Sequence, residues 1–306
     1  MARFVLRRLV ALVPVALGAS FAAFFLIHLI PGDPAEVIAG IGASGTDIER
    51  VRGQLGLDRP VLVQYALWLE RALVGDLGMS LVSRQPVLGQ VLSRFGNTLQ
   101  LSLAGMAVAL GLGLSTGIAA AVRRGTLWDY VFTLLAIFGV SVPIFWLGLL
   151  LMLLFALELG WLPATGMDGA AAFVLPALTL GLNAAALIAR ITRSSVLDVL
   201  GPGLRPHRPR QGREPAAGAV GARAPQRGHP HPHRLGAAVR VSAGGAVLTE
   251  TVFVWPGLGR LLTDAILQRD FPVIQGGILI VALSMILLNL VTDLLYAVAD
   301  PRIRYD

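Results

Sequence analysis

The sequence predicts an all-α, polytopic membrane protein, and three observations support this prediction. Hydrophobic residues make up 55% of the 306 residues, and charged residues only 14%, against roughly 25% charged residues in an average soluble protein. The mean hydropathy is +0.72. Several apolar runs reach the length of about 20 residues that an α-helix needs to cross a bilayer. We therefore expect a bundle of membrane-spanning helices.

The apolar runs indicate six spans. Four are uninterrupted, at about Leu9–Ile30, Leu99–Val122, Val131–Leu157 and Ile278–Val298. Two are weaker: Ala170–Ala189, which contains Pro176 and Asn183, and Leu235–Trp255, which contains Arg240. An arginine at the centre of a span costs about 2.5–3.5 kcal/mol on insertion. We count both weaker runs as spans.

Arginines beside the spans indicate that both termini are cytoplasmic, because basic residues in short loops are retained on that side. With six spans, four clusters fall on one side: Arg3, Arg7 and Arg8; Arg123 and Arg124; Arg190 and Arg193; Arg302 and Arg304. A cleaved signal peptide is the alternative interpretation of residues 1–30. The apolar run is longer than such peptides usually have, and no small-x-small cleavage signal follows it.

The spans divide the chain into an N-terminal helix (1–30), an external helical loop domain (31–97) and a transmembrane core (98–306). Within the loop domain, Thr46-Asp-Ile-Glu49 has the spacing of a capping box, and Pro60 suits the first turn of a second helix. One face of that second helix carries Tyr65, Trp68, Leu69 and Ala72. We expect this helix to lie on the membrane or to pack on the spans, and direct contact with a substrate is the alternative.

The composition excludes several chemistries. A nucleotide-hydrolysing P-loop needs a lysine, and the chain has none. Cysteine, the H-E-x-x-H pattern and the G-x-S-x-G pattern are also absent. His229, His231 and His233 alternate with proline and have no acidic neighbour, which argues against a metal site. We therefore expect neither catalytic residues nor a bound metal or cofactor.

Polar residues inside apolar helices are costly in lipid and usually face a partner or a cavity. On the last span, Asn289, Asp293, Tyr296 and Asp300 recur at i, i+4, i+7 and i+11, so they share one stripe. The stripe either lines a pathway or bonds helices together, and we favour the second interpretation. Small residues on the second span indicate close helix packing: Gly111, Gly113, Ser115, Thr116 and Gly117.

Residues 202–241 differ from the rest of the chain. They contain eight arginines, seven prolines, four histidines and one glutamate, and their charge of +7 equals that of the whole chain. Because the positive charge is confined to this stretch, it does not indicate a folded surface that binds nucleic acid.

Short motifs follow one another in a fixed order over residues 1–200 and 243–306. They are Arg7-Arg8, Ile30-Pro-Gly-Asp-Pro34, Gly75-Asp-Leu-Gly-Met-Ser80 with Pro86-Val87, Asn97-Thr-Leu-Gln-Leu-Ser102, Ser141-Val-Pro-Ile-Phe-Trp146, Leu162-Pro-Ala-Thr-Gly166, Leu175-Pro-Ala-Leu178, Thr249-Glu-Thr-Val-Phe-Val-Trp-Pro-Gly257 and Asp300-Pro-Arg302. In this order and spacing the chain resembles the inner-membrane permease subunits of bacterial ATP-binding-cassette (ABC) importers of the dipeptide, oligopeptide and nickel group.

The resemblance implies the type I ABC importer permease fold, a location in the bacterial inner membrane and a set of partners. These partners are a second permease, two ATPases that use ATP and Mg²⁺, and an external solute-binding protein. The permease would form the translocation pathway by alternating access and perform no chemistry. Two alternatives stay open: an ATP-independent channel or proton-coupled carrier that uses Asp293, and a nonfunctional product of a damaged gene.

The resemblance also implies a short cytoplasmic helix between spans 4 and 5 that couples the permease to the ATPases, expected near Asp198, Gly201 and Gly212. Here the sequence departs from the family pattern. If the family's usual sequence is written in GC-rich codons and translated one nucleotide out of frame, the product closely matches Gly201-Pro-Gly-Leu-Arg-Pro206. The next paired glycines, Gly244 and Gly245, stand at the family's usual spacing.

We interpret residues 202–242 as frameshifted by two compensating indels, with a genuine proline-rich insert as the alternative. Pro202, Pro206, Pro209 and Pro215 would each cost roughly 3 kcal/mol inside a helix. We therefore expect the literal chain to insert poorly and not to couple to ATP hydrolysis.

Overall fold

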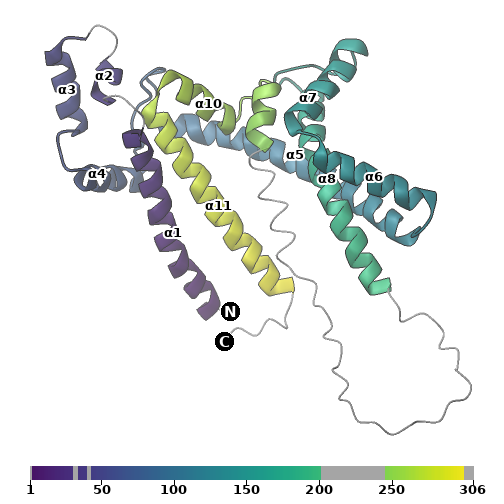
Figure 1. Cartoon of the computed structure of the whole chain (residues 1–306). Helices are drawn as coiled ribbons and strands as arrows, with labels where there is room; N and C mark the ends of the chain where they lie inside the picture. The colour runs from purple at the N-terminus through teal and green to yellow at the C-terminus, as the bar shows by residue number, and fades with distance from the viewer. Residues whose placement is uncertain (1, 30–33, 40–42, 201–244, 300–306) are drawn as a thin grey trace, which may run out of the picture. The chain divides into compact units, whose positions relative to one another are not determined.

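The computed structural model describes residues 2–29, 34–39, 43–200 and 245–299 (Figure 1). These residues form helices and loops, with one isolated β-bridge between Met79 and Pro86 and no sheet among them. The all-α prediction is confirmed for this part of the chain. Residues 202–242, Asp300 and the C-terminal arginines lie outside it. The helices belong to two compact units, one of Met1–Gln100, Thr165–Met167 and Glu250–Asp306 and the other of Leu101–Ala164 and Asp168–Thr249.

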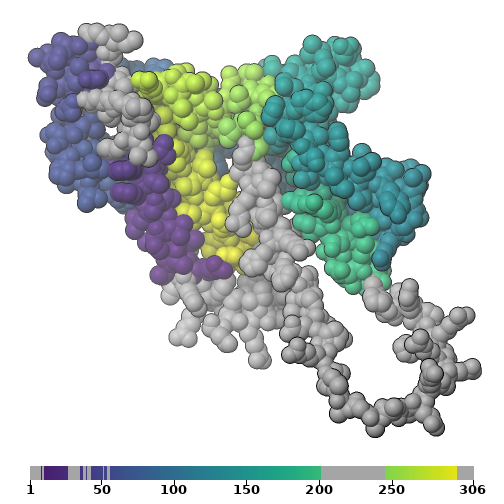
Figure 2. Space-filling view, in the orientation of Figure 1, coloured from purple at the N-terminus to yellow at the C-terminus, as the bar shows by residue number. Residues whose placement is uncertain are grey.

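The first unit contains two long helices that lie side by side (Figure 1), and the space-filling view shows them in contact (Figure 2). These are α1 (Ala2–Leu29) and α11 (Phe271–Ala299). Its shorter helices are α2 (Pro34–Ala39), α3 (Gly45–Leu55), α4 (Val61–Leu73) and α10 (Leu258–Gln268), and α5 (Val87–Val122) begins in this unit. The core of the unit is apolar and is built around Phe24, Trp68, Val87, Leu258 and Phe271.

Helix α4 packs on this core through its apolar face. This is one of the two arrangements expected for it, packing on the spans. Trp68 is buried, and Tyr65, Leu69 and Ala72 pack against the same cluster. The Tyr65 ring meets the Phe24 ring with centroids 5.6 Å apart, and its hydroxyl lies 2.7 Å from the Ser20 hydroxyl of α1. The phenol therefore satisfies its polar group while its ring is buried.

The start of α3 differs from the predicted capping box at Thr46. The N-cap is Ser44, two residues earlier, with an extended backbone at φ −71° and ψ 157°. Its hydroxyl oxygen accepts a hydrogen bond from the backbone N–H of Asp47 at 3.3 Å. Serine and aspartate three residues apart form the same reciprocal arrangement as a serine and glutamate pair, so two overlapping patterns competed and the earlier one caps the helix.

The second unit contains the rest of α5 together with α6 (Leu127–Ser141), α7 (Ile144–Met152), the π-helical turn η1 (Leu153–Glu158) and α8 (Ala171–Leu200). The run Val131–Leu157, expected as one uninterrupted span, is instead broken: the chain bends by 105° between Leu127–Ser141 and Ile144–Glu158. Pro143 lacks an N–H and disfavours helical backbone at the preceding residue. Val142 accordingly has extended angles of φ −77° and ψ 125°.

Small residues bring α8 close to its neighbours. A Cβ added to Gly113 would lie 2.8 Å from the Cβ of Ile188, and one added to Gly117 would lie 2.6 Å from the carbonyl oxygen of Ala189. Nothing lies within 4 Å of a Cβ added to Gly111. The expected close packing is therefore confirmed for Gly113 and Gly117 and wrong for Gly111, which lies on another face of α5.

Helix α8 is continuous although it contains Pro176 and Asn183, the two residues that weakened its prediction as a span. The Asn183 side-chain amide donates to the Gly139 carbonyl of α6 at 3.1 Å. The polar group of Asn183 therefore has a partner within the bundle, as burial in lipid requires.

Three described helical segments are long and apolar enough to cross a bilayer: α5, α8 and Phe271–Leu294 of α11. The bent pair of α6 with α7 and η1 makes a fourth if it counts as one span, and the apolar part of α1, Val10–Leu26, is shorter. The predicted span Leu235–Trp255 is described only from residue 245, and residues 245–252 are helical.

Candidate functional site

A buried carboxylate joins two of the sequence motifs in the first unit. Glu250, in the motif Thr249–Gly257, has none of its surface exposed. Its Oε1 accepts the Thr98 hydroxyl at 2.5 Å and its Oε2 accepts the Arg260 backbone N–H at 3.0 Å. The Thr98 hydroxyl oxygen in turn accepts the Leu258 N–H at 2.8 Å. Glu250 and Thr98 thus hold the loop before α10 against the first half of α5.

The neighbouring residues strengthen this junction. The Asn97 side-chain amide donates to the Pro256 carbonyl at 2.8 Å, and the Trp255 indole N–H donates to the Asn97 carbonyl at 3.2 Å. Gly257 leaves no room for a Cβ, because the Glu250 carboxylate occupies that space. A buried network in which every polar group has a partner favours one arrangement of the backbone.

A second buried carboxylate fixes the motif Gly75–Ser80. Asp270, between α10 and α11, accepts the Ser80 hydroxyl at 2.5 Å and the Leu81 N–H at 3.1 Å. Asp270 and Ser80 are both nearly inaccessible, with exposed fractions of 3% and 2%. This contact joins the loop that leads into α5 to the start of α11.

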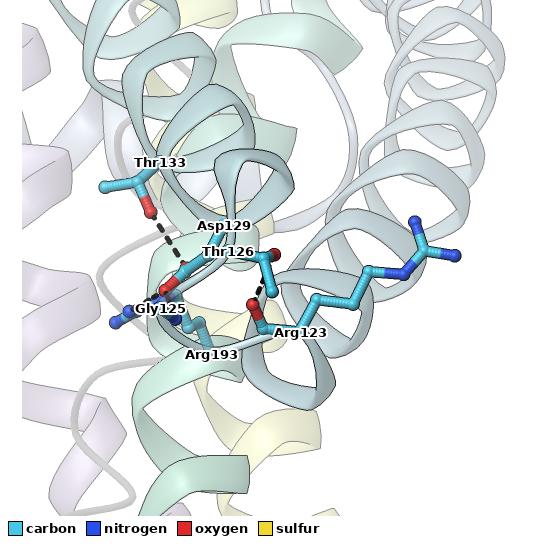
Figure 3. A network of polar contacts seen from close by, with 6 residues as sticks. All are labelled: Arg123, Gly125, Thr126, Asp129, Thr133 and Arg193. Atoms are coloured by element: carbon cyan, nitrogen blue, oxygen red, sulfur yellow. Dashed lines mark hydrogen bonds and ion pairs between the residues drawn. The ribbon is translucent and has the colours of Figure 1, made fainter.

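In the second unit, Asp129 at the start of α6 and Arg193 of α8 form a two-pronged ion pair (Figure 3). The Arg193 Nε donates to Oδ1 at 2.7 Å and its Nη2 donates to Oδ2 at 2.9 Å. Oδ2 also accepts the Gly125 N–H at 3.0 Å, and the Thr133 hydroxyl lies 3.5 Å from Oδ1. Two parallel N–H donors of this kind make the interaction stronger and fix the orientation of the carboxylate. The pair joins α6 to the last third of α8.

The residues predicted for coupling to an ATPase lie at and beyond the end of α8. Asp198 occupies the last turn of α8 and is exposed. Gly201 and Gly212 lie outside the described residues. Towards Asp198, α8 also presents Arg190, Arg193 and Ser194 at spacings that share one face.

The residues of the polar stripe predicted on the last span have different surroundings in the structure. The Asp293 carboxylate forms an ion pair with Arg8 of α1, with Oδ2 and Nη1 3.1 Å apart. Asn289 is exposed, and the side chain of Tyr296 lies outside the described residues. The Arg8 contact is between the two helices that pack side by side, which supports the helix-packing interpretation for Asp293.

Sequence reasoning missed the partners of three buried acids. Asp129, Glu250 and Asp270 are each an acidic residue in a mostly apolar stretch, and that contrast was a usable signal. The motifs were recognised, but the Asp129–Arg193 pair was not. In the part of the chain that the structure describes, no three His, Cys, Asp or Glu side chains gather as they would around a metal ion.

The apolar helices joined by buried polar contacts define a multi-pass helical membrane protein. Residues 113–205 and 234–305 match the family described as "Binding-protein-dependent transport system inner membrane component", and residues 1–102 match the N-terminal part described for the same systems. The chain belongs to this family of ABC importer permeases of the bacterial inner membrane. The family comprises transport components. Its name states the dependence on a binding protein, and membership of the ABC importers implies ATPase partners.

Similar proteins cover the whole chain. The glutathione transport system permease protein GsiC of Escherichia coli is 42% identical over 305 residues, which span 100% of this chain and 100% of the relative. The proteins of that name from Salmonella typhi and Salmonella choleraesuis are each 43% identical, with the same coverage.

Proposed function

We propose that this chain forms, with a second permease, the pathway of an ATP-driven importer for short peptides of the size of glutathione. The similarity to permeases named for glutathione transport, over the full length of both chains, carries this proposal. Glutathione is a modified tripeptide and falls in the peptide class that the sequence motifs predicted. Nickel or another small solute is the second candidate, because the external binding protein does most of the selection.

The proposed assembly contains two permeases, two ATPases that hydrolyse ATP with Mg²⁺, and one external binding protein. The proposed topology has six spans and cytoplasmic termini. Two contacts support it. The Arg8–Asp293 ion pair brings the start of α1 to the later part of α11. Arg124, Arg190 and Arg193 line one cavity, so these two arginine clusters lie at the same end of their helices.

For the polar stripe, we assign Asp293 to helix packing and keep Asn289 and Tyr296 as candidates for the pathway. The assignment of Asp293 rests on its ion pair with Arg8. The exposure of Asn289 in the single chain supports a role at the surface that faces the second permease or the substrate.

We further propose that residues 202–242 result from a reading-frame shift in the coupling loop of Asp198, Gly201 and Gly212. The family match stops at residue 205 and resumes at residue 234. The alignment of 305 residues nevertheless covers 100% of the relative. This segment therefore replaces one of similar length and adds almost no residues to the chain. Resequencing the gene around codons 201 and 242 tests this proposal. An unaltered reading frame in the transcript would contradict it.

Uptake into vesicles tests the transport function. The chain is reconstituted with its partner permease, ATPases and binding protein, once as the literal sequence and once with residues 202–242 read in the restored frame. We expect ATP-dependent uptake of labelled glutathione or dipeptide by the restored chain and little by the literal one. An ATPase-inactive partner should abolish uptake. Uptake that persists without ATP hydrolysis and follows a proton gradient would favour a carrier that uses Asp293.

A further inference from the structure

A cavity of about 920 Å³ lies within the second unit, between α5, α6 and α8. Its size falls in the range of roughly 300–1,000 Å³ that is typical of small-molecule sites. One part of its wall is basic and comes from Arg124, Arg190 and Arg193. Another part is apolar and includes Phe132, Ile137 and Leu197. The cavity therefore combines cationic and hydrophobic surfaces.

Two of the three arginines are available to a ligand. The guanidinium of Arg193 is occupied by Asp129. Arg124, Arg190 and the Ser194 hydroxyl make no side-chain hydrogen bond or ion pair within the described ranges 2–29, 34–39, 43–200 and 245–299. Among the described residues that line the cavity, Asp198 is the one acid, so this lining keeps a net charge of +1 after Asp129 neutralises Arg193. This arrangement suits a ligand with one negative charge.

Aromatic residues place this end of the unit at the membrane surface. Trp128 and Tyr130 lie in the first turn of α6, one turn before the cavity residues Phe132 and Thr133, and have exposed fractions of 56% and 67%. Exposed tryptophan and tyrosine are enriched at the level of lipid headgroups. Ile137, two turns further along α6, is 53% exposed and belongs to the apolar wall. The cavity thus extends from headgroup depth towards the hydrocarbon, whichever leaflet it faces.

We propose that this cavity binds an anionic glycerophospholipid. Arg124 and Arg190 hold its phosphate, the Ser194 hydroxyl donates to a phosphate oxygen, and an acyl chain lies along Phe132, Ile137 and Leu197. Basic pockets between membrane helices are known to favour anionic headgroups. A free phosphate ion would satisfy the arginines but leave the apolar wall exposed, so the combination of the two surfaces favours the lipid.

The test measures lipid retained by the purified full-length chain, by native mass spectrometry after incubation with mixed phosphatidylglycerol and phosphatidylcholine. We expect selective retention of phosphatidylglycerol. The double variant Arg124→Gln/Arg190→Gln should lose it by about tenfold for each arginine, because hydrogen bonds to charged groups are the strong ones. The control is Arg123→Gln, whose side chain points away from the ion pair and does not line the cavity (Figure 3).

Three results would overturn the proposal: equal retention of both lipids by the unmodified chain, unchanged retention in the double variant, or equal loss in Arg123→Gln. A further arm uses inorganic phosphate alone. If phosphate displaces phosphatidylglycerol completely at millimolar concentration, the cavity is a free-anion site and the lipid proposal is wrong. If the double variant does not fold, two measurements still decide the test. One is the single variant Arg190→Gln, which should show a smaller loss of retained phosphatidylglycerol, and the other is the lipid competition on the unmodified chain.

Discussion

The hydroxyl of Thr98 donates a hydrogen bond of 2.5 Å to the carboxylate of Glu250, which lies 152 residues further along the chain. This contact joins the motif Asn97–Ser102, in the first half of α5, to the motif that precedes α10. Both groups are surrounded by other hydrogen bonds, and Glu250 is fully buried. The first unit therefore depends on a polar junction as well as on its apolar core.

Glu250→Ala should destabilise the protein. It would leave the Arg260 N–H without its acceptor and the Thr98 hydroxyl with only the 3.2 Å contact to the Arg94 carbonyl. A buried polar group left unsatisfied costs about 1–3 kcal/mol. The midpoint of thermal unfolding in detergent measures the effect. The control is Glu70→Ala, at an exposed site on α4 of the same unit, which should change the midpoint little. Equal midpoints for the two variants would contradict this role for Glu250.

Gly257→Ala should also destabilise, for a steric reason. The backbone of Gly257, at φ −96° and ψ 179°, suits any residue, but an added Cβ would meet the Glu250 carboxylate. Overpacking of this kind costs roughly 1–3 kcal/mol. The control is Gly96→Ala within α5, where nothing lies within 4 Å of the new Cβ and helix propensity should add up to about 1 kcal/mol of stability. Unfolding midpoints that move in the same direction for both variants would disprove the argument.

The ion pair of Asp129 and Arg193 should show a measurable coupling energy. A double-mutant cycle with Asp129→Ala and Arg193→Ala should give about 1–3 kcal/mol, because Asp129 is only 6% exposed and the contact has two prongs. The control cycle uses the exposed pair Asp47 and Arg50, with side-chain exposures of 46% and 65%. There we expect a smaller coupling energy, because solvent screens an exposed ion pair. A coupling for the Asp129 pair no larger than that of the control would mean that the pair does not hold α6 to α8.

The cap of α3 should respond to pH through Asp47. Hydrogen bonds from Ser44, followed by the charge of Arg50, hold the pKa of the Asp47 carboxyl below its ordinary value of 3.8. A lowered pKa stabilises the folded state above pH 3.8, and this contribution is lost as the pH falls through the lowered value. Ser44→Ala should move the pKa back towards 3.8.

Carbon NMR titration of the Asp47 carboxyl measures this change. The control is Ser83→Ala, because the Ser83 hydroxyl accepts a hydrogen bond from the Gln90 amide and, among the described residues, bonds none of α3. An Asp47 titration curve that is the same with and without the Ser44 hydroxyl would show that the cap does not set the pKa.

Much of the local structure was predictable because it depends on neighbouring residues. The spans α5 and α8, the apolar face of α4 and the close approach at Gly113 and Gly117 follow from residue type and helical spacing. Three local predictions were wrong: the packing of Gly111, the cap of α3 and the unbroken run Val131–Leu157. Ser44 competed with Thr46 as the cap of α3, and Pro143 broke an apolar run whose hydropathy shows no interruption.

By itself, the sequence determined that this is a helical membrane protein and that it belongs to the binding-protein-dependent permeases, because hydropathy and motif order can be read along the chain. Only the tertiary structure decided which side chains bind the buried acids: the Thr98 hydroxyl for Glu250, the Ser80 hydroxyl for Asp270 and the Arg193 guanidinium for Asp129. These partners lie 64 to 190 residues away in sequence. Such contacts depend on where helices meet in space, which no local pattern of residues specifies.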